Sequence, residues 1–99
     1  MFDIQLSTGV WNDLKPLPAR DQRIILDAIE EHLTHQPTVK TKKRKILLNL
    51  VPPWQNVPPI WELRVDDYRV FYDVADEEKT VYVRAIRYKP PHSRTEDIL

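Results

Sequence analysis

Three stretches in the C-terminal half of the chain alternate apolar and polar side chains, and this alternation limits the fold more than any other feature. They are residues 60–65, "IWELRV", residues 68–74, "YRVFYDV", and residues 80–88, "TVYVRAIRY". A period of two is typical of a β-strand that buries one face. Only Asp66 and Asp67 separate the first two stretches, which is the length of a tight hairpin turn. The sequence therefore predicts a three-stranded antiparallel meander whose apolar face needs a cover.

The alternation also divides the side chains of this meander between two faces. One face is predicted to be apolar and to pack against helices. The other carries Arg64, Arg69 and Arg84, with Phe71 and Tyr82 between them. The predicted apolar face holds Trp61, Leu63, Val65, Val70, Tyr72, Val74, Val81, Val83 and Ala85, and the polar face also holds Glu62, Asp73, Ile86 and Tyr88.

The N-terminal half supplies the helices that such a sheet requires. Residues 1–7, "MFDIQLS", alternate like a half-buried strand. A short helix follows, limited by Pro16 and Pro18 because proline cannot donate a backbone hydrogen bond. A second helix is predicted over residues 19–35. The predicted fold is α+β, with an N-terminal strand and a helical hairpin packed on a mainly antiparallel four-stranded sheet.

The whole chain, residues 1–99, is predicted to form one domain, since a chain of this length can bury one core. Residues 37–59 are rich in proline and are predicted to be a long loop, with a short extended stretch at 46–51. Trp54 lies between prolines in this loop, and we expect it to be exposed. Residues 90–99 are predicted to be a short polar tail.

The composition argues against several kinds of site. The chain has no cysteine, so neither a disulfide framework nor a thiolate metal site is expected. Its only glycine, Gly9, rules out a glycine-rich phosphate loop. His32 and His35 have helical spacing but no third ligand, so no metal and no cofactor are expected. No apolar segment is long enough for a membrane span or a signal peptide, and the expected location is the cytoplasm, without a membrane partner.

The formal net charge is zero, but the charge is unevenly distributed. Residues 40–45, "KTKKRK", hold five bases and no acid. A general attraction to nucleic acid needs more positive charge than the whole chain has, so any nucleic-acid contact must be local. This basic run is most often a solvated segment, and the alternative is that it reaches RNA or an acidic partner.

Two interpretations of the arginines on the polar face stay open. Arginine beside exposed aromatic rings suits phosphate binding and base stacking. Alternatively, Glu62 and Asp73 lie on the same predicted face and can form cross-strand ion pairs with these arginines. An antiparallel sheet also commonly has one polar face for solubility alone.

The meander sequence resembles that of a known family. The stretch "WELRVDDYRVFYDV" has an aromatic residue, x, Leu and Arg before a short turn, followed by Tyr-Arg-Val-x-Tyr. With the third strand "TVYVRAIRYK" and the order strand, two helices, meander, the chain resembles the RelE/ParE superfamily of small toxins from type II toxin–antitoxin modules. The resemblance implies a RelE/ParE-like fold over nearly the whole chain. The connection at residues 37–59 is longer than is usual in this family.

The resemblance implies one of two activities. RelE-like members cut messenger RNA in the ribosomal decoding site, where the 2′-hydroxyl attacks the adjacent phosphate, whereas ParE-like members poison DNA gyrase without this chemistry. We expect a RelE-like translation inhibitor with a degenerate catalytic set, so that mRNA endoribonuclease activity is an open question. The alternatives are a ParE-like gyrase inhibitor without catalysis and a non-toxic binding module on the same fold. The implied partners are a cognate antitoxin and either the ribosome with mRNA or DNA gyrase.

The site residues that the resemblance implies are mostly basic. Arg69 matches the family arginine that binds phosphate in the nucleases, and Arg64 matches a frequent strand arginine. Arg87 or Lys89 is the basic residue expected after the third strand. Nucleic-acid contacts are further expected from Arg84, Lys42, Lys43 and Arg44.

This sequence also departs from the nuclease pattern. Glu62 occupies a strand face where the nucleases place lysines, and no tyrosine follows Lys89. Tyr88 or His92 would have to move protons in its place. The predicted catalytic residues are therefore Arg69, Arg64, Arg87, Lys89, Tyr88 and His92.

Overall fold

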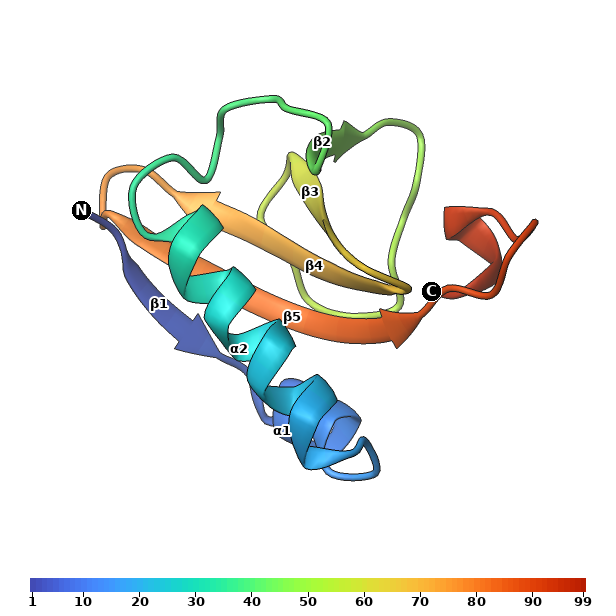
Figure 1. The fold of residues 1–99 in the computed structure, drawn as a ribbon. Helices are drawn as coiled ribbons and strands as arrows, with labels where there is room; N and C mark the ends of the chain where they lie inside the picture. The colour runs from blue at the N-terminus through green and yellow to red at the C-terminus, as the bar shows by residue number, and fades with distance from the viewer.

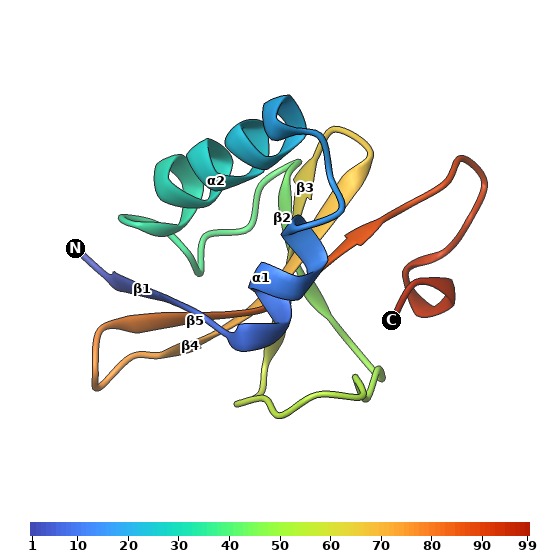
Figure 2. The same ribbon diagram turned by 90° about the horizontal axis from the view of Figure 1, so that it is seen from below.

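The sheet has five strands in the order β1-β5-β4-β3-β2, and both helices lie on one of its faces (Figures 1 and 2). This computed structural model describes all 99 residues. The α+β class and the helix-covered sheet are confirmed, but the sheet has five strands rather than four, because β2 forms within the segment predicted as a loop. The elements are β1 (Asp3–Leu6), α1 (Thr8–Leu14), α2 (Ala19–Leu33), β2 (Arg44–Leu47), β3 (Ile60–Val65), β4 (Tyr68–Ala75), β5 (Thr80–Tyr88) and a 3-10 helix, η1 (Thr95–Asp97).

The C-terminal meander forms as the alternation predicts. Asp66 and Asp67 make the two-residue turn between β3 and β4, and Asp66 has a left-handed backbone with a φ of 51°. Aspartate tolerates this conformation better than most residues. The two edges of the sheet differ, because β1 runs parallel to β5 whereas β2 runs antiparallel to β3.

The main core lies between the helices and one face of the sheet. α1 contributes Val10 and Leu14, and α2 contributes Ile25, Ile29 and Leu33 at helical spacing. The sheet residues that were predicted to face the helices do so, with the exception of Ala85 near the end of β5. Leu63, Val65, Val70, Tyr72, Val81 and Val83 belong to this core, and Val74 packs against it.

A β-bulge in β5 changes the faces of its last residues. The pairing shifts between Phe71 and Tyr72 of β4, so that Arg84 is the extra residue on β5. Beyond the bulge the alternation is displaced by one position, and Ile86 enters the main core. Strict alternation holds only while pairing is regular. The faces predicted from the sequence are therefore wrong for Ala85, Ile86 and Tyr88.

The loop at residues 48–59 partly covers the opposite face of the sheet. Phe71 is fully buried there, and Trp54 packs on it with ring centroids 5.4 Å apart. The Arg87 guanidinium lies over the Trp54 ring, 5.5 Å from its centroid. The expectation of an exposed Trp54 is therefore wrong, because its ring is half-buried against the sheet. Phe71 is likewise unavailable for stacking with a ligand.

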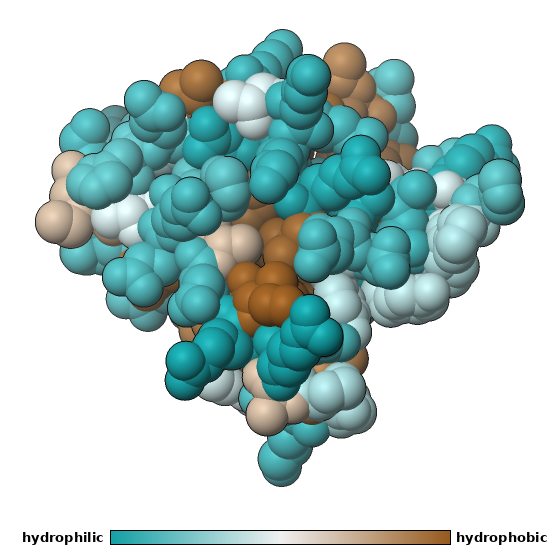
Figure 3. Space-filling view, viewed as in Figure 1, coloured by the Kyte–Doolittle hydropathy of each residue, from teal (hydrophilic) through white to brown (hydrophobic).

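The surface seen over the helices is mostly hydrophilic, with a small hydrophobic area near its centre (Figure 3). Exposed charged residues of α2, such as Arg20, Asp27 and Glu30, contribute to this character. No helix has both the length and the apolar character needed to cross a membrane.

Candidate functional site

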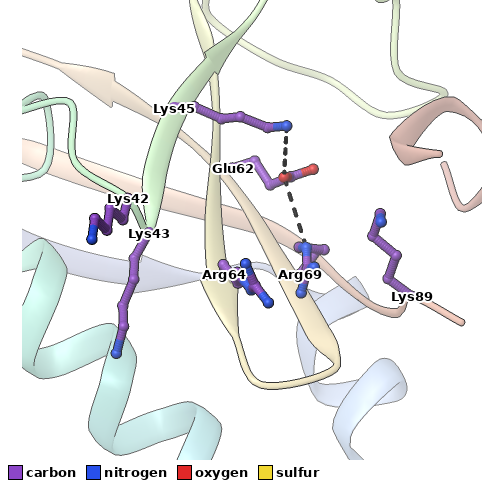
Figure 4. Close-up of a pocket in the computed structure, with 7 residues that line it drawn as sticks. All are labelled: Lys42, Lys43, Lys45, Glu62, Arg64, Arg69 and Lys89. Carbon is purple, nitrogen blue, oxygen red and sulfur yellow. Dashed lines mark ion pairs between the residues drawn. The ribbon is translucent and has the colours of Figure 1, made fainter. Parts of the chain in front are cut away.

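Seven side chains line a pocket of about 230 Å³ on the sheet face opposite the helices, and we call it the cationic pocket (Figure 4). Six of the seven side chains are basic and Glu62 is the only acid, which gives the lining a formal charge of +5. The whole chain, by contrast, is neutral. The lining residues are Lys42, Lys43, Lys45, Glu62, Arg64, Arg69 and Lys89.

Strand pairing brings these residues together. Lys45 of β2 lies opposite Glu62 of β3, and Arg64 of β3 lies opposite Arg69 of β4. Side chains directly opposite each other on neighbouring strands share a face, so these four point away from the helices. Lys89 follows β5, and its backbone N–H donates to the carbonyl of the second turn residue between β3 and β4, at 2.7 Å. The pocket thus draws on β2 with the residues before it, on the β3–β4 hairpin and on the residue that follows β5.

Glu62 is held by three side chains. Its Oε1 lies 3.6 Å from Lys45 Nζ and 3.8 Å from Arg69 Nε, and its Oε2 accepts a hydrogen bond of 2.7 Å from Thr95 Oγ1. The carboxylate lies between Lys45 and Arg69 in Figure 4. Only 4% of the Glu62 side chain is exposed, and a buried carboxylate needs such partners to offset its lost hydration.

The Arg69 side chain stabilises the β3–β4 turn through hydrogen bonds and also faces the cationic pocket. Its Nη1 donates to the carbonyl oxygens of Asp66 and Tyr68, at 2.9 and 2.8 Å. Burial lowers the pKa of Arg69 from its ordinary value, and the nearby Glu62 carboxylate opposes this shift. Its Nη2 makes no hydrogen bond within the chain and is free to donate to a ligand.

Arg84 lies outside the cationic pocket. Its Nε and Nη2 donate to the two carboxylate oxygens of Asp73, at 2.9 and 3.0 Å, and its guanidinium lies 4.7 Å from the centroid of the Tyr82 ring. Asp73 is fully buried. The guanidinium is thus occupied by an internal carboxylate, as one of the two interpretations of the arginines allowed.

Three predicted catalytic residues do not line the pocket. Arg87 Nη1 donates to the Asp13 carboxylate of α1, at 2.7 Å. Tyr88 packs edge-on against Tyr68, with ring centroids 6.0 Å apart. His92 lies at an exposed position of the tail, with a φ of 66°. The cationic pocket therefore contains Arg64, Arg69 and Lys89 of the predicted catalytic set, and neither a tyrosine nor a histidine.

Arg44 is buried on the helix side of the sheet. Its Nη1 donates to the carbonyl of His32 in the last turn of α2, at 2.6 Å, and its Nε donates to the carbonyl of Val39, at 3.0 Å. A cation at the C-terminal end of a helix is favourable because the last carbonyls have no partner within the helix. Of the four predicted nucleic-acid contacts, the structure brings only Lys42 and Lys43 to the pocket.

Sequence reasoning missed Lys45 and Glu62 as members of the site. The sequence does carry a signal for Lys45, since Lys43 and Lys45 alternate within the basic run. Glu62 was recognised as an acid on the polar face, but not as a neighbour of Lys45. That proximity follows only from the pairing of β2 with β3, in a segment whose sequence indicates a loop.

This arrangement suits a ligand that carries phosphate. Arginine and lysine bind phosphate oxygens through charge-assisted hydrogen bonds, and several cations in one concavity raise the local concentration of anions. No cluster of three or more His, Cys, Asp or Glu side chains is arranged to hold a metal ion.

The sequence matches a protein family over residues 4–89, and this family is described as the ParE toxin of type II toxin–antitoxin systems, parDE. The chain belongs to this ParE toxin family. The resemblance to the RelE/ParE superfamily is thereby confirmed, and the protein is a toxin of a type II toxin–antitoxin system. No curated protein matches the sequence of this toxin.

Solved structures of RelE toxins share the fold of this ParE-family toxin. A RelE–RelB complex from the archaeon Pyrococcus horikoshii OT3 matches with a TM-score of 0.69 and 19% identity, covering 91% of this chain and 97% of that one. The RelBE2 complex from Mycobacterium tuberculosis matches with a TM-score of 0.69 and 20% identity, covering 89% of this chain and 98% of that one. The isolated E. coli RelE toxin matches with a TM-score of 0.66 and 15% identity, covering 98% of this chain and 93% of that one. At these identities the matches establish the fold and not the activity.

Proposed function

We propose that this toxin is a RelE-like translation inhibitor that binds messenger RNA in the ribosomal decoding site through the cationic pocket and cleaves it. The observation that carries the proposal is the concentration of six basic side chains in one pocket of a chain with no net charge. The RNA backbone presents the closely spaced phosphates that such a site fits. The fold shared with solved RelE toxins agrees with this proposal.

The pocket residues can divide the cleavage chemistry among them. The RNA 2′-oxygen attacks the adjacent phosphorus, so that the O2′–P bond forms, the P–O5′ bond breaks, and a cyclic phosphate and a 5′-hydroxyl result. Arg64 and Arg69 stabilise the negative charge that develops on the phosphate oxygens. The other lining side chains are lysines and arginines, which already carry a proton when they are charged. The Glu62 carboxylate therefore accepts the proton of the 2′-hydroxyl. A lysine ammonium of the pocket, Lys45 or Lys89, supplies the proton to the 5′-oxygen.

The proposed partner is a cognate antitoxin. The solved structures with this fold include toxin–antitoxin complexes, among them RelE with RelB and RelBE2. An antitoxin that covers the cationic pocket needs acidic side chains to match a lining charge of +5.

A ParE-like inhibitor of DNA gyrase is the second candidate. The matched family is that of ParE, and the cationic pocket lacks both tyrosine and histidine. In this case the pocket would bind DNA phosphates or an acidic surface without cleaving a bond.

Induction of the protein in growing cells separates these functions when mRNA 5′ ends and gyrase–DNA cleavage complexes are mapped in parallel. The proposal predicts new mRNA ends within translated regions and no increase in gyrase complexes. Arg64→Ala should strongly reduce the number of new ends, whereas the control Arg23→Ala, an exposed cation on α2, should retain them. Gyrase complexes with intact mRNA would support the second candidate instead. Normal growth would support a non-toxic binding module.

A further inference from the structure

The C-terminal tail, residues 90–99, lies beyond the family match and nevertheless reaches the cationic pocket. The match ends at residue 89, where the last strand has just finished. The tail then turns back, and η1 lies near the end of β5 (Figure 1). The Thr95 side chain of η1 contacts Glu62 of β3.

Thr95 makes the only hydrogen bond that joins the tail to the rest of the chain. Its hydroxyl donates to Glu62 Oε2 at 2.7 Å, and the two residues are 7% and 3% exposed. Other hydrogen bonds of the tail stay within it, as in the bond from Ser93 Oγ to the carbonyl of Pro90. A hydrogen bond to a carboxylate in so dry an environment is strong and directional.

The two oxygens of the Glu62 carboxylate have different partners. Oε2 is held by the tail, whereas Oε1 faces Lys45 Nζ and Arg69 Nε at 3.6 and 3.8 Å. These longer distances indicate ion pairs without a short hydrogen bond. Thr95 is thus the only partner of Glu62 at hydrogen-bond distance, and it determines how the carboxylate plane is turned.

We propose that Thr95 is a positioning residue of the site, which holds Oε2 so that Oε1 points at the cations that bind the RNA phosphate. The inference rests on the proposed function, in which Glu62 takes the proton of the 2′-hydroxyl. Groups that act on a reacting atom depend on such supporting contacts, and a misplacement of about 1 Å costs up to about 100-fold in rate. The tail therefore belongs to the site, although it contributes no cation to the lining.

Three tail variants test this role. Thr95→Val removes the hydroxyl with little change in shape, Thr95→Ser retains a hydroxyl, and Ser93→Ala removes a tail hydroxyl that does not contact Glu62. We expect Thr95→Val to slow single-turnover cleavage of ribosome-bound mRNA by on the order of tenfold or more. The Kd of Thr95→Val for mRNA with a 2′-deoxy residue at the cleavage position should stay within about twofold of the wild-type Kd, because the cations that bind the phosphate remain. Thr95→Ser and Ser93→Ala should behave like the wild type.

A double-mutant comparison distinguishes positioning from a general loss of structure. If Thr95 acts through Glu62, Thr95→Val should add no further slowing in a Glu62→Gln background. Equal slowing in both backgrounds, or wild-type cleavage by Thr95→Val, would overturn the inference.

A second measurement does not depend on cleavage. The NMR resonance of the Arg69 Nε–H group reports the orientation of the carboxylate beside it. Thr95→Val should shift this resonance in the same direction as Glu62→Gln, and Thr95→Ser should leave it in place. An unchanged resonance in Thr95→Val would overturn the inference even for an active enzyme. A wild type that cleaves no mRNA would refute the proposed function, while the resonance would still decide whether Thr95 positions Glu62.

Discussion

Arg64, Arg69 and Arg84 lie on one face of the sheet, but they differ in how much of each guanidinium is available to a ligand. Arg64 is exposed and makes no ion pair within the chain. Arg69 donates to the carbonyls of Asp66 and Tyr68 and lies beside Glu62, and Arg84 donates two hydrogen bonds to the Asp73 carboxylate. A phosphate therefore meets Arg64 and part of Arg69, whereas Arg84 serves the stability of the sheet.

Loss of the Arg84 side chain should destabilise the domain. Arg84→Ala leaves the Asp73 carboxylate, which is 1% exposed, without its bidentate partner. We expect the free energy of unfolding to fall by about 2–4 kcal/mol, less than for a fully buried pair because 17% of the Arg84 side chain is exposed. Denaturant unfolding measures this change. The control Arg64→Ala should change the stability by less than about 0.5 kcal/mol, and equal stability of the two variants would contradict a structural role for Arg84.

His32 should make the stability depend on pH in a known direction. Burial lowers the pKa of His32, the Glu31 carboxylate raises it, and Arg44 and Lys43 lower it further. The unfolded chain therefore takes up the proton first as the pH falls below about 6.5, and the free energy of unfolding decreases. His32→Gln should weaken this dependence when denaturant unfolding is measured at about pH 7.5 and about pH 5.5. The same pH dependence in both proteins would contradict the expected contribution of His32.

The meander could be predicted from the sequence because its alternation is local. Residues such as Leu63 and Val70 face the helices as the period of two requires. The bulge at Arg84 could not be predicted in the same way, since it is a property of the pairing between β4 and β5. β2 was not predicted as a strand, because its core side carries only Arg44 and Ile46, and the buried Arg44 interrupts the apolar alternation.

The site was predictable only where a single segment specifies it. Arg64 and Arg69 flank one hairpin turn, and Lys89 follows the next strand, so the motif of the meander indicates all three. The contacts of Glu62 instead join β3 to β2 and to the tail. Such contacts depend on tertiary structure that no local pattern encodes.

The register of the sheet predicts a clear difference between two aspartate substitutions. Val81→Asp places a charge in the core, where Val81 is fully buried, and should unfold the domain because an unpaired buried charge costs several kcal/mol. Val51→Asp changes a side chain that is 91% exposed and should leave the melting temperature nearly unchanged. Circular dichroism during heating measures both variants. A Val81→Asp protein that melts near the wild-type temperature would refute the register.

The molecule as a whole is neutral, and yet one pocket carries a formal charge of +5. The strands collect bases on one face, while the compensating acids lie elsewhere, as at Asp27 and Glu30 on exposed positions of α2. Net charge is therefore a poor guide to this toxin, because attraction to RNA depends on the local field at the site. This separation of charge agrees with local binding of a phosphate backbone.

Cleavage of mRNA on purified ribosomes by the purified toxin tests most directly whether the cationic pocket is an RNA-cleaving site. We predict cuts that leave 5′-hydroxyl ends, and a rate that falls by about 10- to 150-fold in Arg64→Ala, since a charge-assisted contact contributes about 1.5–3 kcal/mol. The exposed α2 control Arg23→Ala should cleave at the wild-type rate. Intact mRNA with the wild-type protein, or an Arg64→Ala protein as fast as the wild type, would contradict the account.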